Sequence, residues 1–231
     1  MNSGLESRAV TNHFRTFGLV LPALVGGTLA GCASSPDLTR PYEIRPLTSD
    51  GAPASRKEIV IERTGVRIVL EALGDEERSR WLSEVAAIPT DPLLTRAGDK
   101  DFVTFRLRVE ASGPDAVNLE SQAIRIWSPD GKISGAPLDY TRAYEILRPD
   151  IESAPDAADL RKFMKGLIDG PVHVASGRFR EGLLVFPEPP AEMIEMILEL
   201  SFVHVGTSTH QIKIPLIKVF DAEEEPHTPR T

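Results

Sequence analysis

Cysteine is the scarcest informative residue in this sequence: Cys32 is the single thiol among 231 residues. One thiol cannot form a disulfide within the chain, so the fold has to be stabilised by a hydrophobic core. The roughly 200 residues that follow it are enough for one domain with such a core. No apolar run reaches the roughly 20 residues of an ordinary membrane-spanning helix. The sequence therefore predicts one domain and excludes a small disulfide-stapled scaffold.

Basic residues are also in short supply. The whole chain has 26 Lys and Arg against 34 Asp and Glu, a net charge of −8. Without residues 1–31, which carry Arg8, Arg15 and Glu6, the counts become 24 and 33, a net charge of −9. A negative surface repels phosphate groups. We therefore expect no nucleic-acid partner and no electrostatic attraction to anionic lipid.

Motifs that carry catalysis are missing as well. The chain has no Gly-rich phosphate loop, no His-Glu-x-x-His, no Gly-x-Ser-x-Gly and no Ser-x-x-Lys. Its acidic clusters, Glu76-Glu77 and residues 223–225, are typical of a helix start and a solvated tail. We expect the protein not to be an enzyme and to need no cofactor.

The single cysteine lies in an informative setting. Residues 29–32 read Leu29-Ala30-Gly31-Cys32, after a basic start and an uncharged stretch that begins at Phe17. Positive charge keeps the start of an export signal on the cytoplasmic side, and small residues admit a signal peptidase. A thiol directly after them can accept a diacylglyceryl group.

This arrangement resembles a bacterial lipoprotein signal peptide with its lipobox. The resemblance implies export, removal of residues 1–31 and a lipid anchor on Cys32. The n-region has no Arg-Arg pair, which favours the general secretory route. Ala33, rather than aspartate, follows the cysteine, and this resembles sorting to the outer membrane with the domain facing the periplasm. In a host with one membrane, the same signal would place the chain on the outer face of the cytoplasmic membrane.

The chain after the cleavage point divides into three parts. Residues 32–56, rich in Pro, Ser, Thr and Asp, predict a lipidated N-terminus and a disordered tether. Residues 57–220 have the apolar periodicity of a folded domain. Residues 221–231 predict a disordered acidic tail.

Apolar residues in the folded part recur mostly with period two, as in half-buried strands. Strands are predicted at residues 57–62, 66–70, 102–110, 124–127, 172–175, 183–186, 194–205 and 211–220. Alternation is clearest in 102–110, where Val103, Phe105, Leu107 and Val109 share one face. Helices are predicted at 75–87, 156–169 and, more briefly, 140–147. In 156–169, apolar residues at i, i+3, i+4, i+7 and i+8 from Leu160 form one face.

Many strands with one or two inserted helices predict a mainly β protein, folded as an antiparallel β-sandwich. Trp127, on a mid-chain strand, is typical of a core tryptophan. The pattern, including the stretch SGRFREGLLVFP at residues 176–187, resembles immunoglobulin-like extracytoplasmic domains of bacterial lipoproteins. That family has no assigned reaction, so the resemblance implies a non-catalytic domain.

The last two predicted strands bring histidines together. Pairing their apolar faces sets Phe202 opposite Ile212 and requires an odd number of loop residues. The same register places His204 beside His210, with Cβ atoms about 5 Å apart. Two imidazoles can share a metal ion or respond to pH, and an acidic residue or His173 is a candidate third ligand. A solvated hairpin rim is the other interpretation.

These features predict a lipid-anchored cell-envelope lipoprotein that acts as a non-catalytic binding or assembly module. We expect its partners to be the membrane, through Cys32, and an envelope protein. The alternative is a periplasmic lipoprotein that binds a metal ion or small ligand at the rim formed by His204 and His210.

Overall fold

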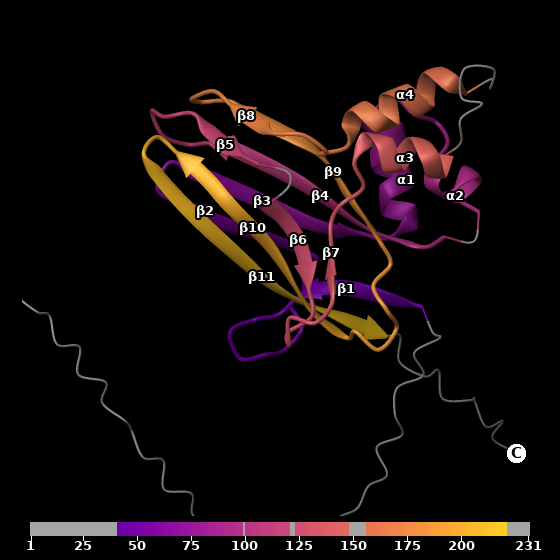
Figure 1. The fold of residues 1–231 in the computed structure, drawn as a ribbon, viewed down its shortest axis with the longest axis horizontal. Helices are drawn as coiled ribbons and strands as arrows, with labels where there is room; N and C mark the ends of the chain where they lie inside the picture. The colour runs from indigo at the N-terminus through magenta and orange to yellow at the C-terminus, as the bar shows by residue number, and fades with distance from the viewer. Residues whose placement is uncertain (1–40, 99, 121–122, 148–155, 221–231) are drawn as a thin grey trace, which may run out of the picture. The chain divides into compact units, whose positions relative to one another are not determined.

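The computed structural model describes residues 41–98, 100–120, 123–147 and 156–220. In these ranges the chain forms two antiparallel sheets, with four short helices in two insertions (Figure 1). None of these helices is long and apolar enough to cross a membrane. The prediction of a mainly β sandwich with helical insertions is confirmed, and the immunoglobulin-like connectivity stays a prediction.

The smaller sheet has four strands in the order β2-β3-β4-β9. Their bounds are Glu58–Arg63 (β2), Val66–Leu73 (β3), Phe102–Ala111 (β4) and Phe179–Pro187 (β9). β2 and β3 form the predicted hairpin, and the predicted inward face of β4 is fully buried. Period-two alternation thus predicted the centre of this sheet.

The larger sheet has the order β1-β11-β10-β5-β8, with β6 also paired to β10 and β7 to β6. The bounds are Tyr42–Pro46 (β1), Val117–Leu119 (β5), Ile124–Trp127 (β6), Ser134–Gly135 (β7), Val172–Val174 (β8), Glu195–Val205 (β10) and Ser208–Phe220 (β11). β10 has two partners on one side: β6 along residues 197–200 and β5 along residues 203–205.

β1 corrects the predicted domain boundary. It lies inside the predicted tether, residues 32–56, yet it pairs with β11 along its whole length. Ile44 is buried in the main core. A five-residue strand next to prolines carries too few apolar residues to show a period, and its pairing partner is far away in sequence. The folded domain therefore includes residues 41–56 and does not begin at residue 57.

Two hydrophobic cores share the strand β9. The main core lies between the sheets, and the second lies under the helices α1 (Asp75–Glu84), α2 (Pro92–Arg96), α3 (Tyr140–Leu147) and α4 (Ala157–Gly166). Leu184 and Phe186 point into the main core, whereas Leu183 and Val185 point under the helices. Burial on both faces explains the unbroken apolar run in this strand.

α4 is shorter than the helix predicted at residues 156–169. It ends at Gly166 because Leu167 is extended and forms a bridge with Leu183 of β9. The backbone N–H of Ile168 then donates to the Leu183 carbonyl at 2.8 Å. Strand pairing therefore replaces the last helical turn.

A buried ion pair joins the first two helices. Nε of Arg78 in α1 donates to Oδ2 of Asp91 at 2.6 Å, and both side chains are 2% exposed. The other carboxylate oxygen of Asp91 accepts from the N–H of Leu93 and caps α2. Arg78 also pairs at 2.8 Å with Asp75, which is 64% exposed. The carboxylate of Asp91 thus neutralises the buried charge of Arg78 and also accepts a hydrogen bond from the first turn of α2.

Candidate binding surface

The surface begins with an irregularity in β10. This strand is paired in register with β11 up to Leu200 and again from Val203. Between these points two residues of β10, Ser201 and Phe202, face one residue of β11, Gln211, which makes a β-bulge. The bulge lies where β10 changes partner from β6 to β5.

The bulge turns Phe202 out of the core. Its φ is +55°, in the left-handed region, and its side chain is 55% exposed. A bulky residue at positive φ is a rare outlier that costs about 1–2 kcal/mol. The predicted pairing of Phe202 with Ile212 is wrong because the extra residue shifts the register, so that Leu200 takes this place. Outliers of this kind concentrate at functional sites.

The predicted side-by-side placement of His204 and His210 is wrong for the same reason. His204 lies opposite Thr209, so His210, the next residue of β11, points to the other face of the sheet, opposite Val203. The hairpin loop has two residues rather than an odd number. Nε2 of His210 is buried and lacks a hydrogen-bond partner within the described ranges. Nor do those ranges hold three or more His, Cys, Asp or Glu side chains grouped to bind a metal ion.

His204 belongs instead to a row that crosses four strands on the outward face of the larger sheet. Its cross-strand neighbours are Thr209 on β11 and Asn118 on β5, and Asn118 in turn lies opposite His173 on β8. The intervening residues, such as Val203, point into the main core. His173 therefore shares a face with His204, but Asn118 lies between them. We call Phe202, His204, Thr209, Asn118 and His173 the outer row.

Hydrogen bonds orient both imidazoles of the outer row. Nδ1 of His173 donates to Oδ1 of Asn118 at 2.6 Å. Nδ1 of His204 lies 3.0 Å from the hydroxyl of Thr209, within hydrogen-bond distance. The rings of Phe202 and His204 are stacked, with centroids 6.3 Å apart and planes at 20°. The row thus combines a stacked aromatic pair, Phe202 and His204, which we call the ledge, with polar groups held in place.

The same outward face continues along β10 to Trp127. This residue lies on β6 opposite Ile197 and is half-buried, because Ile124 and Ile126 occupy the inward positions. The core position predicted for Trp127 is therefore wrong.

Charges of both signs lie between Trp127 and the outer row. Glu199 is opposite both Arg125 and Lys213. Its carboxylate accepts hydrogen bonds from Ser201 and Gln211, and these, the Ser201 bond above all, lower the pKa of Glu199. A group that mixes both signs of charge in this way favours neither a cationic nor an anionic ligand.

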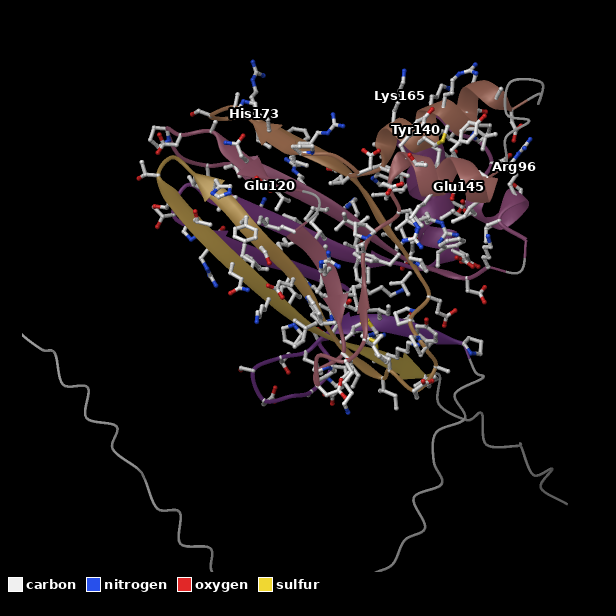
Figure 2. The ribbon with its side chains drawn as sticks, in the orientation of Figure 1. Arg96, Glu120, Tyr140, Glu145, Lys165 and His173 are labelled. Carbon is white, nitrogen blue, oxygen red and sulfur yellow. The ribbon has the colours of Figure 1, made fainter. Side chains whose placement is uncertain are left out.

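The outer row lies far from the point where the chain enters the domain. β1 begins at Tyr42 and pairs with the end of β11 at Phe220, whereas Thr209 is near the start of β11. At about 3.3 Å per residue, β11 spans about 36 Å between Thr209 and Phe220. Figure 1 shows β1 and the hairpin tip of β10 and β11 at opposite ends of the larger sheet. In Figure 2, His173 lies at the end of the domain away from Tyr140 of α3.

A cleft lies at the other end of the domain, and ion pairs lie in its lining. It has a volume of about 550 Å³ and lies between β1 and the start of α1. Nζ of Lys57 bonds Glu43 at 3.0 Å and Glu77 at 2.9 Å. Tyr42 donates to Glu188 at 2.7 Å. These contacts attach β1 to the rest of the domain, so we assign the cleft a structural role.

The predicted lipidation site lies outside the described residues. This applies to Cys32 and to the lipobox residues Leu29, Ala30 and Gly31.

No family model matches this chain, and no curated protein matches it. It is similar to a functionally unknown protein of Listeria monocytogenes EGD-e, at 9% identity and a TM-score of 0.37, over 70% of this chain and 83% of that one. A candidate lipoprotein of Bacillus subtilis has 11% identity and a TM-score of 0.36, over 72% and 39% of the two chains. A candidate ApaA protein of Bordetella pertussis has 8% sequence identity and a TM-score of 0.26, and the match covers 75% of this chain and 100% of that one. Similarity this distant leaves the function to be argued from the residues themselves.

Proposed function

We propose that this protein is a lipoprotein of the bacterial cell envelope, anchored through Cys32, whose sandwich is a non-catalytic binding module. The observation that carries the binding role is Phe202. Its backbone is in an unfavourable region and its ring is more than half exposed. Both features lower the stability of the fold, whereas a ligand that covers the ring would recover part of the cost.

The anchor part of the proposal rests on residues 29–32 and on the length of chain that follows them. Eight residues, 33–40, separate Cys32 from Pro41, so the nine steps of this link extend at most about 30 Å. Two or three acyl chains hold a protein firmly at a membrane, whereas one alone is marginal. We place the anchor in the outer membrane with the domain in the periplasm, or on the outer face of the cytoplasmic membrane in a host with one membrane.

Labelling with radioactive palmitate tests the anchor. Cys32→Ser removes the thiol that accepts the lipid, so the label in this chain should disappear. Ser34→Ala, two residues away, is the matched control and should keep the label. Undiminished labelling of the Cys32 variant would refute the lipoprotein proposal.

Site-specific photocrosslinking tests the binding surface. A benzophenone analogue of phenylalanine at position 202 keeps an aromatic ring at the outer row. The control is position 179, because Phe179 is 57% exposed but lies on the outward face of the smaller sheet. We expect crosslinks to an envelope component from position 202 and not from 179. Equal crosslinking at both positions, or none at 202, contradicts the assigned surface.

A further inference from the structure

The apolar surface around the outer row is too small for a stable protein interface. Phe202 is the one large hydrophobic residue among the described ranges that is exposed on this face. At 55% exposure, a side chain of roughly 200 Å² offers about 110 Å². A specific protein interface buries about 800 Å² on each partner, with several aromatic or aliphatic anchors at its centre. The row therefore fits a ligand that needs one stacking platform and many hydrogen bonds.

The polar groups of the row suit hydroxyl groups. Because Nδ1 of His173 donates to Asn118, the neutral ring presents Nε2 as an acceptor. The amide nitrogen of Asn118 is a donor, and the hydroxyl of Thr209 can both donate and accept. A sugar hydroxyl likewise donates and accepts, so it can satisfy each of these groups. Pyranose rings also present C–H groups of partial positive charge to the negative face of an aromatic ring, here the ledge of Phe202 and His204.

The row extends too far for a single sugar unit. From Thr209 to His173 it crosses three strand spacings, about 14 Å. Trp127 lies on the same face, five residues along β10 from Phe202, which is about 17 Å. An extended chain of several units can contact the ledge, the amide and the second imidazole together.

We infer that the outer row binds an extended, hydroxyl-rich polysaccharide chain without net charge, stacked on Phe202 and His204 and hydrogen-bonded by Asn118 and His173. This inference rests on the proposed function and names the ligand class of that site. The sequence predicted an envelope protein as partner, and the small apolar area argues instead for a glycan. The row lies about 36 Å along β11 from Phe220, which pairs with Tyr42 at the start of β1.

Calorimetric titration of the full lipidated chain in detergent tests this inference. The probes are a six-unit chain of β-1,4-linked N-acetylglucosamine, its monosaccharide and a polyuronic acid of similar length. We expect the neutral chain to bind, the monosaccharide to bind at least tenfold more weakly and the polyanion not to bind. Quenching or enhancement of tryptophan fluorescence provides a second readout, because Trp127 lies on the same face.

Two variants and one control assign binding to the row. Phe202→Ala and Asn118→Ala should each weaken binding of the neutral chain at least tenfold, with thermal melts that show retained folding. Phe179→Ala removes an equally exposed ring from the other sheet and should leave binding unchanged. Equal affinity of wild type and Phe202→Ala overturns the inference, as does tighter binding of the polyanion.

The crosslinking experiment separates failure of this inference from failure of the proposed function. No heat with the glycans, together with crosslinks from position 202 to an envelope protein, overturns the glycan and leaves the binding module intact. No heat and no crosslinks overturn both.

Discussion

Replacing Phe202 by glycine and by alanine separates the backbone cost at this position from the contribution of the ring. Both changes remove the same contacts beyond Cβ, so their difference reports mainly the backbone. At φ +55° an alanine retains the left-handed cost of about 1–2 kcal/mol, whereas glycine does not. Glycine in turn loses about 0.5–1 kcal/mol of conformational entropy relative to alanine. We expect Phe202→Gly to be more stable than Phe202→Ala by about 0.5–1 kcal/mol.

His204 gives the matched control for this comparison. It lies on the same strand and face, two residues further on, and is not among the residues with positive φ. In an extended strand the order is reversed, and His204→Gly should be less stable than His204→Ala by about 0.5–1 kcal/mol. The difference in stability between the glycine and alanine variants should thus have opposite signs at positions 202 and 204.

Urea unfolding, checked by thermal melts, measures these differences. In a domain of this size, 1 kcal/mol corresponds to about 2–4 °C in Tm. If glycine is the less stable variant at position 202 as well, the left-handed backbone does not exist in solution. Such a result would refute the bulge at Phe202 and the binding role proposed for this residue.

Three further predictions concern the fold. A fragment of residues 41–220 should unfold cooperatively and at a higher temperature than residues 57–220, which lack β1; equal melts would show that β1 does not contribute. Asp91→Ala should lower the free energy of unfolding in urea by about 3 kcal/mol, because it leaves the buried guanidinium of Arg78 in α1 without this partner. Replacing the exposed Asp75 by alanine should lower it by less than about 1 kcal/mol. The hydrogen bond from the guanidinium of Arg96 in α2 lowers the pKa of Asp156. The ionised carboxylate of Asp156 therefore stabilises the fold above about pH 4, and this stabilisation is lost as the pH falls through the lowered pKa. The stability difference between wild type and Asp156→Asn should therefore shrink as the pH falls below about 4, and a constant difference would contradict the assigned cause.

Local patterns were sufficient where one face of a strand meets the core and the other meets solvent. β4 was predicted with its inward face because Phe105 and Leu107 alternate with arginines. The run from Leu183 to Phe186 was also predicted as a strand, but its burial on both faces was not. The helices that cover its second face come from other parts of the chain, so no local pattern could show this.

The sequence of β10 contains a sign of the bulge, which the predicted register of β10 and β11 did not take into account. Apart from Ile197, the apolar residues of β10 occupy even positions up to Leu200, and from Val203 the buried ones occupy odd positions. A change of parity within one strand means that one residue is extra. Phe202 shares the earlier parity, and so it was assigned to the core.

The sequence by itself determined the sandwich class, the central strands and the candidate anchor at Cys32, because each depends on residues close together in the chain. The tertiary structure alone decided that β1 belongs to the domain and that Asn118 and His173 join His204 in one row. These side chains come from three strands far apart in sequence, and only strand pairing sets which of them are neighbours. Pairing in turn depends on a bulge that exchanges the inward and outward faces of β10, so the binding surface exists only in the folded sheet.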